Sequence, residues 1–211
     1  MLKGIIFDMD GVLVDSEPFI CEAAMRMFAE RGVTVSAEDF IPFVGAGEDR
    51  YIGGVAEKHG IALDIDRDKA RTYAIYAEIV RGRLEPLDGV HEFIAKARAR
   101  GMKLALASSA DRVKIEVNLR EIGLPPETFD AVVSGLDVVN KKPDPEIFLT
   151  AGQMLGLSPD ECLVVEDAVN GVAAAKTAGM RCLGLTTSFS AEELSAADWI
   201  AGTLADAPEV M

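Results

Sequence analysis

Short apolar runs recur along the chain, and each is bounded by polar or turn-forming residues. Runs of this kind indicate fully buried strands of a parallel sheet. Strands are predicted at residues 5–7, 103–107, 131–133, 162–165 and 181–185. Between the later strands, apolar residues recur with the spacing of amphipathic helices. The pattern predicts an α/β protein with a Rossmann-like parallel sheet covered by helices on both faces.

Cap residues indicate where several helices begin. Pro18 is suited to the first turn of a helix, with Ser16 or Glu17 at the cap. Near the end of the chain, Ser190 and Glu193 have the spacing of a capping box and predict a further short helix.

The stretch from residue 17 to residue 85 differs from the rest, because nothing in it has the pattern of a strand. A glycine-containing bend at 43–50 precedes one helix, and a longer amphipathic helix is predicted over 66–83. We therefore expect a small helical domain inserted after the first strand. The expected division is a core of residues 1–15 and 87–211 and a helical insertion of residues 16–86.

The composition and net charge of the chain exclude some classes of binding partner. The chain has 211 residues, with 21 Lys+Arg against 35 Asp+Glu, and a formal net charge of -14. This balance argues against nucleic-acid or anionic-membrane partners, because both require basic surface. No apolar run approaches the length of a membrane-spanning helix. The three cysteines are scattered and are expected to be free thiols.

Two aspartates, Asp8 and Asp10, follow the first predicted strand one residue apart. In open α/β sheets, ligands bind beyond the carboxyl ends of the strands. Carboxylates this close repel each other and need a cation or a shared proton. Taken alone, the pair is equally compatible with a turn, where Asp is common.

The other strand ends and loops decide between these interpretations. They place Ser108, Lys142, Glu166 and Asp167 at the same edge of the sheet as the two aspartates. Several carboxylates with a hydroxyl and an ammonium form the hard-oxygen site that Mg²⁺ prefers, and Mg²⁺ readily shares its coordination shell with phosphate. The sequence thus predicts a Mg²⁺ site that can share oxygens with a phosphate.

These residues resemble the four motifs of the haloacid dehalogenase-like hydrolase superfamily in order and spacing. The motifs are residues 8–13, Ser108, Lys142-Pro143 and Glu166-Asp167. The resemblance spans essentially the whole chain, and the insertion resembles the C1-type cap. Within the superfamily, the chain is similar to the branch that includes β-phosphoglucomutase, phosphoglycolate phosphatase and small sugar-phosphate phosphatases. Residues 43–48 and 107–112 are also similar to the hydrolase domain of the plant suppressor-of-quenching proteins.

The resemblance implies a role for each matched residue. Asp8 would be the nucleophile that forms an aspartyl-phosphate, and Asp10 the general acid and base. Lys142 would complete the catalytic set by holding Asp8 ionised. Mg²⁺ would be held by Asp8, the backbone carbonyl of Asp10, and Asp167, with Glu166 binding directly or through water. The implied activity is a Mg²⁺-dependent phosphatase acting on a sugar phosphate or a phosphoglycolate-like metabolite.

Some substrate contacts stay open at the level of sequence. Ser108 is favoured as a phosphate ligand by strand register, while Ser109 is either a second ligand or a helix cap. Gly45, Gly47, Glu48 and Arg50 would face the core site if the insertion closes over it as in the relatives. Arg50 is equally suited to a surface salt bridge.

Two other functions compete with the phosphatase. A phosphomutase of the β-phosphoglucomutase type depends partly on a histidine early in the first cap helix, and residues 15–20 contain none, which favours hydrolysis. A regulatory module that only binds a partner would not need the complete set of motif residues. We expect a monomer located in the cytoplasm or, for a domain of a plant protein, in the chloroplast stroma.

Overall fold

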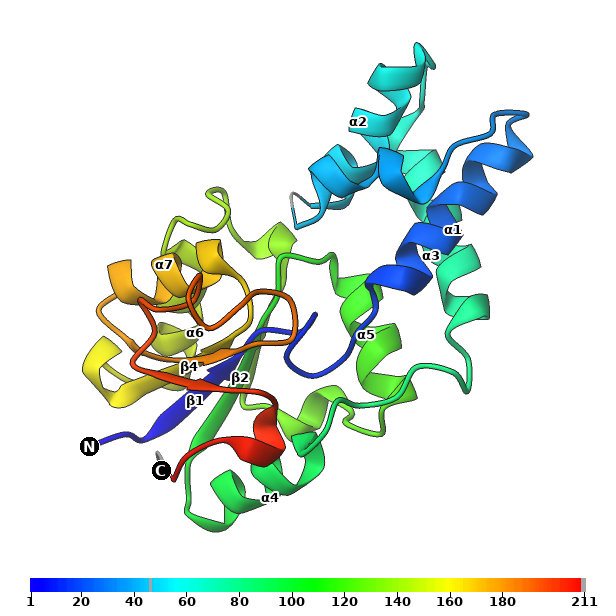
Figure 1. The fold of residues 1–211 in the computed structure, drawn as a ribbon. Coiled ribbons are helices and arrows are strands. Elements are labelled where there is room, and N and C mark those ends of the chain that lie inside the picture. Colours follow the sequence, from blue (N-terminus) through cyan, green and yellow to red (C-terminus); the bar gives the residue numbers. More distant parts are fainter. Residues whose placement is uncertain (46, 210–211) are drawn as a thin grey trace.

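The computed structural model describes residues 1–45 and 47–209. Its centre is a sheet of six strands in the order β3-β2-β1-β4-β5-β6 (Figure 1). Every neighbouring pair is parallel. The strands are β1 (Gly4–Phe7), β2 (Lys103–Ala107), β3 (Ala131–Val133), β4 (Cys162–Glu166), β5 (Arg181–Leu185) and β6 (Trp199–Ala201).

Helices follow most strands, as the apolar spacing predicts. The α-helices are α1 (Glu17–Glu30), α2 (Glu48–His59), α3 (Ile65–Ile79), α4 (Val90–Ala99), α5 (Arg112–Glu121), α6 (Glu146–Leu155) and α7 (Val169–Thr177). Single 3-10 turns occupy Ala37–Asp39, Ile41–Phe43, Pro126–Thr128, Gly135–Asp137, Pro159–Glu161 and Leu204–Asp206.

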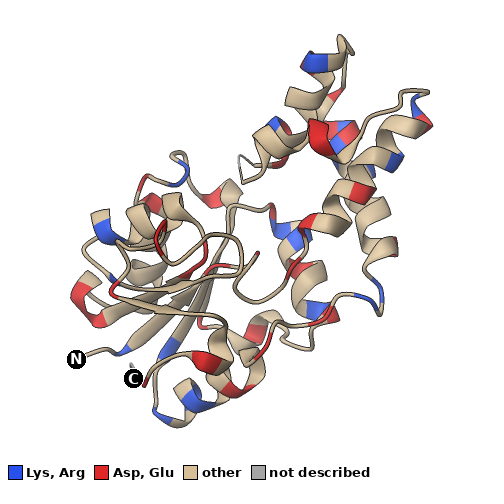
Figure 2. Cartoon of the chain, in the orientation of Figure 1, with Lys and Arg blue, Asp and Glu red and all other residues tan. Residues whose placement is uncertain are grey.

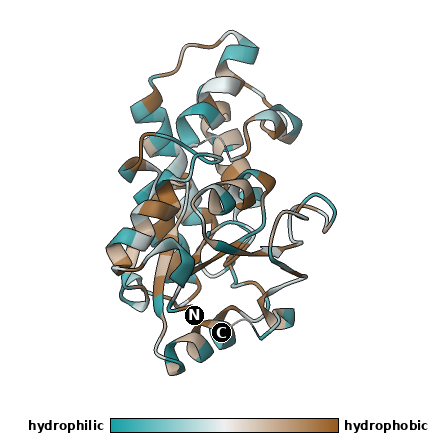
Figure 3. Ribbon diagram, turned by 90° about the vertical axis from the view of Figure 1, so that its left-hand side faces the viewer, coloured by the Kyte–Doolittle hydropathy of each residue, from teal (hydrophilic) through white to brown (hydrophobic). Residues whose placement is uncertain are grey.

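The two faces of the sheet pack against different helices. In β1, Ile5 and Phe7 belong to one apolar cluster, which also contains buried residues of α4 and α5. Ile6 belongs to a second cluster with buried residues of α6 and α7. The alternation follows from the period of two residues along a strand. In Figure 3 the hydrophobic stretches accordingly lie in the sheet and in the helices beside it.

Residues 16–86 form a separate group of helices beyond the carboxyl edge of the sheet (Figure 1). No strand occurs among those of residues 16–86 that the structure describes, as predicted; Ala46, within the predicted bend, lies outside them. The chain enters and leaves this insertion at neighbouring points. The Leu87 N–H donates to the Leu13 carbonyl at 2.9 Å, and Val14 forms a β-bridge with Pro86.

The end of the chain differs from its prediction. The Ser190 N–H and hydroxyl both donate to Glu193, at 2.9 and 2.7 Å, as in a capping box. Residues 191–196 nevertheless form turns rather than the predicted helix, because the chain must reverse there. The reversal brings Trp199 onto Leu183 and adds β6, a strand that three residues of mixed character do not signal in sequence.

The long helix of the insertion is shorter than predicted. We expected it to reach residue 83, but α3 ends at Ile79. Gly82 then adopts a φ of 65°, and its N–H donates to the Glu121 carboxylate at 2.9 Å. This bond to α5 turns the chain back toward the core.

Both signs of charge are distributed over the outer helices (Figure 2). Among residues 1–45 and 47–209, no helix is long and apolar enough to cross a membrane.

Candidate active site

A cavity of about 930 Å³ lies between the carboxyl edge of the sheet and the insertion. Its floor is formed by residues at or beyond the carboxyl ends of β1 to β5. Its other wall comes from α1, α2 and the segment between them. The sequence-predicted residues that line it are Asp8, Asp10, Gly45, Ser108, Ser109, Lys142, Glu166 and Asp167. The fold therefore brings these eight residues, from distant parts of the chain, together around one cavity.

Arg50 is the predicted site residue that does not line this cavity. Its guanidinium pairs with the exposed Glu57 carboxylate at 2.7 Å and lies 5.0 Å from the centre of the Phe43 ring. The surface salt bridge, the alternative left open in the sequence, is the arrangement that the structure adopts.

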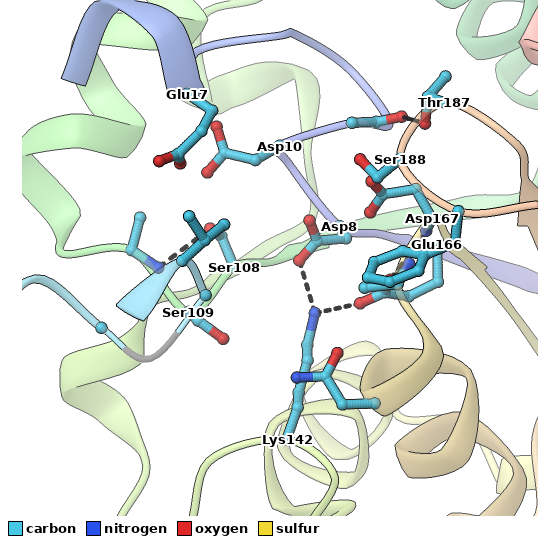
Figure 4. Close-up of a pocket in the computed structure, with 18 of the residues that line it drawn as sticks. Asp8, Asp10, Glu17, Ser108, Ser109, Lys142, Glu166, Asp167, Thr187 and Ser188 are labelled. Carbon is cyan, nitrogen blue, oxygen red and sulfur yellow. Dashed lines mark hydrogen bonds and ion pairs between the residues drawn. The ribbon is translucent and has the colours of Figure 1, made fainter. Parts of the chain in front are cut away.

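Lys142 joins two carboxylates at the floor of the cavity. Its Nζ donates to Asp8 Oδ1 at 2.5 Å and to Glu166 Oε1 at 2.6 Å (Figure 4). All three side chains are nearly fully buried. The second oxygen of Glu166 accepts from the backbone N–H groups of Asp167 and Ala168, both at 2.8 Å. Glu166 thereby fixes both the ammonium of Lys142 and the loop after β4.

Gly11 allows the first and fourth motifs to approach each other. It has a φ of 75°, and a Cβ built there would lie 1.9 Å from Asp167 Oδ2. No larger residue fits this position without displacing the carboxylate. The Gly11 carbonyl also accepts from the Thr187 hydroxyl at 2.5 Å.

Ser108 is the better placed of the two serines that follow β2. It is buried, and its Oγ accepts from the Ala110 N–H at 3.1 Å, which fixes the hydroxyl at the cavity wall. Ser109 also lines the cavity but is only half-buried (Figure 4).

Burial and neighbouring charges shift the pKa values of the acids at the cavity floor. Burial raises the pKa of Asp8 from 3.8 to about 7, while the Lys142 charge opposes that rise. Burial, with the charges of Glu166 and Asp8, raises the pKa of Asp167 to about 8. Burial lowers the pKa of Lys142, but the charges of Asp8 and Glu166 outweigh this and raise it overall. The ammonium of Lys142 pairs with Asp8 and Glu166 but not with Asp167, so the charge of the site favours a further cation.

Asp10 is held apart from this group (Figure 4). Its carboxylate accepts from the Ser16 hydroxyl and from Lys114 Nζ, the latter at 3.0 Å. Ser16 occupies the N-cap position of α1, as predicted, but its side chain makes no cap bond and serves Asp10 instead. The side chain of Lys114 is only 5 % exposed.

The sequence did not indicate Lys114 or Glu17, which also line the cavity. Gly47 and Glu48, which we expected to face the site on closure of the insertion, line it as well. The available signal for Lys114 was weak. It lies four residues before Asn118, so two buried polar residues share one face of α5. Nothing in the sequence indicates that this face meets the insertion.

The donors at the cavity floor fit a magnesium ion. Asp8 and Asp167 supply buried carboxylate oxygens, and burial raises the pKa of each by disfavouring its charged form. No group of three or more His, Cys, Asp or Glu arranged for a metal occurs among the described residues. Such a group is not required, because Mg²⁺ is commonly bound by one or two carboxylates with water and substrate phosphate.

Comparison with known proteins places these observations in a family. Residues 2–179 match the profile of the haloacid dehalogenase-like hydrolases. The chain is 42% identical over 195 residues to the chloroplastic protein SUPPRESSOR OF QUENCHING 1 of Arabidopsis thaliana, covering 90% of this chain but only 18% of that protein. It is 33% identical to the phosphorylated carbohydrates phosphatase of Thermotoga maritima over 190 residues, or 90% of this chain and 88% of that one.

A solved structure agrees with the sequence relatives. CbbY from Rhodobacter sphaeroides in complex with xylulose-1,5-bisphosphate superposes with a TM-score of 0.88 at 28% identity, over 97% of this chain and 96% of CbbY. The profile match covers most of the chain and includes every motif residue described above. This chain is therefore a hydrolase that belongs to the haloacid dehalogenase-like family.

Proposed function

We propose that this protein is a Mg²⁺-dependent phosphatase that hydrolyses a small phosphorylated metabolite through an aspartyl-phosphate on Asp8. The observation that carries the proposal is the buried arrangement of Lys142 between Asp8 and Glu166 at the floor of the cavity. Two relatives support the proposal. The Thermotoga maritima protein is named as a phosphatase of phosphorylated carbohydrates, and the CbbY structure from Rhodobacter sphaeroides contains xylulose-1,5-bisphosphate.

Lys142 prepares Asp8 for attack on phosphorus. Its ammonium opposes the effect of burial on Asp8 and so favours the ionised nucleophile. The same ammonium offers charge to a phosphoryl oxygen beside Asp8. Ser108, fixed at the cavity wall, is suited to donate its hydroxyl proton to a second oxygen.

Asp10 would protonate the leaving oxygen and later accept a proton from the attacking water. Lys114 and Ser16 hold its carboxylate on the side of the cavity that the insertion covers. Mg²⁺ would be held by Asp8, Asp167 and the backbone carbonyl of Asp10, with Glu166 direct or through water. When bound it would neutralise phosphoryl charge.

The insertion acts in this proposal as a cap that keeps water from the reacting atoms and opens for product release. Residues 16–86 then specify the leaving alcohol, while residues 1–15 and 87–209 carry the phosphoryl chemistry. We further expect a monomer in the cytoplasm or chloroplast stroma, compartments that suit the free thiols of Cys21, Cys162 and Cys182.

The structure offers less support for a phosphomutase. The position early in α1 where β-phosphoglucomutase carries its histidine falls in residues 15–20, where Ile20 lines the cavity. No histidine is found among the described residues that line it. Water is therefore the expected acceptor of the phosphoryl group.

The test is phosphate release from phosphorylated metabolites, with and without Mg²⁺, by the wild type and by Asp8→Asn. We expect Mg²⁺-dependent release that falls at least roughly 10⁴-fold in Asp8→Asn, because the covalent route is lost. Circular dichroism checks that the variant folds. Full activity of a folded Asp8→Asn protein, or isomerised sugar phosphate in place of free phosphate, would overturn the proposal.

A further inference from the structure

Glu48 is a buried acid in the wall of the cavity, and one of its carboxylate oxygens has no hydrogen-bond partner among the described residues. It is the first residue of α2, lines the cavity, and is 9% exposed. Its Oε1 is buried without a hydrogen-bond partner in the described part of the chain. Leaving such an acceptor unpaired costs free energy, and in native structures it usually marks a missing partner.

Its position in the first turn of a helix does not explain this burial. Acids are favoured there by the helix dipole, but exposed ones serve that purpose equally well. The next residue, Asp49, has a side chain that is 67% exposed and pairs with Lys69 at 2.5 Å. Of these two acids only Glu48 lines the cavity, so we look for its partner in whatever fills that cavity.

The charge around Glu48 excludes some partners. Lys114 is the cation beside it, and that ammonium already binds Asp10 at 3.0 Å. Glu17 is a second acid of the same wall, and its carboxylate accepts from the Tyr51 hydroxyl at 2.8 Å. The described residues that line the cavity from the insertion include no lysine or arginine. A second anionic group on the substrate would meet two carboxylates there.

A hydroxyl group has the chemistry that Glu48 lacks. Burial raises the pKa of its carboxyl to about 7, so near neutrality it both donates and accepts hydrogen bonds. Alcohol hydroxyls do the same. The cavity volume of about 930 Å³ leaves room for a sugar beside the phosphate.

Resting on the function proposed above, we propose that Glu48 binds the hydroxyl groups of the leaving alcohol and selects monophosphates of neutral, polyhydroxylated alcohols such as sugars. Phosphorylated carboxylic acids and bisphosphates are disfavoured by the same residue. In this respect the chain would differ from its CbbY relative, whose structure holds a sugar bisphosphate.

The experiment compares kcat and KM of the wild type and Glu48→Ala on four classes of substrate. They are glucose 6-phosphate, phosphoglycolate, fructose 1,6-bisphosphate, and p-nitrophenyl phosphate, whose leaving group has no hydroxyl to bind. We expect Glu48→Ala to raise the KM for glucose 6-phosphate roughly tenfold to a hundredfold, the size of a lost hydrogen bond to a charged group. The constants for p-nitrophenyl phosphate should stay within about twofold.

Two further variants sharpen the result. Glu78→Gln removes an acid from the exposed surface of α3 in the same insertion and should behave as the wild type on all four. Glu48→Lys should raise the ratio of kcat/KM for phosphoglycolate to kcat/KM for glucose 6-phosphate by roughly tenfold, because the charge at the cavity wall is reversed. Equal losses on p-nitrophenyl phosphate and glucose 6-phosphate would show a merely structural role and overturn the inference. A wild-type preference for phosphoglycolate or fructose 1,6-bisphosphate over glucose 6-phosphate would overturn it as well.

Failure of the underlying function gives a different result. It would leave p-nitrophenyl phosphate uncleaved by the wild type, or equally cleaved by Asp8→Asn. In either case the role of Glu48 is measured as binding of glucose 6-phosphate to Asp8→Asn by calorimetry. Weaker binding when Glu48→Ala is added supports the assignment, and unchanged binding overturns it.

Discussion

The two ends of the cavity differ in how completely their polar groups are paired. At the core end, Lys142 joins Asp8 to Glu166, and Glu166 also accepts two backbone N–H groups. At the insertion end, Glu48 has an unpaired buried oxygen. The core end is thus prepared before any substrate arrives, whereas the insertion end needs a ligand to complete it. We interpret this difference as a division between chemistry that is fixed and recognition that is left to the substrate.

The largest effect on activity is expected from removing the ammonium that pairs the acids at the core end of the cavity. Lys142→Met keeps the length of the side chain but removes the ammonium that Asp8 and Glu166 share. We expect kcat to fall roughly 10²- to 10³-fold, as for loss of one group that stabilises transition-state charge. Steady-state kinetics with p-nitrophenyl phosphate measures this, and Lys141→Met, at the exposed neighbour, is the matched control. A kcat within threefold of wild type would contradict the comparison.

A smaller effect on kcat is expected at Lys114, which lies between the core end and the insertion end of the cavity. Without its ammonium, the Asp10 carboxylate keeps Ser16 but has Glu17 as a like-charged neighbour. Lys114→Met should lower kcat roughly tenfold to a hundredfold, within the range of general acid-base catalysis. Lys114→Arg keeps the charge and should recover part of this loss. A change in KM alone, with kcat intact, would instead assign Lys114 to substrate binding.

The pH dependence of metal binding tests the core end without substrate. The pKa of Asp8 and Asp167 rises on folding from 3.8 to about 7 and about 8. The metal-free native state therefore holds more protons than the unfolded chain in this window, and its free energy of unfolding falls as pH rises from about 4 to about 8. Mg²⁺ needs the ionised carboxylates and should offset that loss.

Calorimetric Tm values check this. Saturating Mg²⁺ should raise Tm by about 5–10 °C at pH 8 and by much less near pH 5. Asp167→Asn should abolish the increment. An increment that is larger at the lower pH would show that the cation binds elsewhere.

The smallest effect concerns the contact that fixes the insertion to the core. The buried Tyr76 hydroxyl on α3 donates to Asn118 Oδ1 on α5. Tyr76→Phe should lower the free energy of unfolding by about 1–2 kcal/mol, because it leaves Asn118 Oδ1 unpaired in the interior. Tyr73→Phe is the matched control, since the Tyr73 hydroxyl is buried without a hydrogen-bond partner. Urea unfolding of both variants measures the difference, and equal losses would contradict the assignment.

The residues of the core end could be predicted from the sequence, and those of the insertion end only in part. Asp8 and Glu166 end or follow short apolar strands, and parallel strands bring their carboxyl ends to one edge by geometry alone. The position of Lys114 depends instead on how α5 meets the insertion, which no local pattern specifies. Glu48 could be expected at the site, but the burial of its unpaired oxygen could not. Ser16 shows the same limit. Its N-cap position was predictable, but its hydroxyl serves Asp10 because the chain folds back on itself there.

The two crossings between core and insertion lie side by side, joined at Leu13–Leu87 and Val14–Pro86. A segment whose ends are this close is suited to exchange between proteins, because a donor segment needs only to match two adjacent attachment points. Residues 16–86 of this chain could then be transplanted onto the catalytic core of a relative as a cassette. Chimaeras of this kind would recombine one protein's selectivity with another's reactivity.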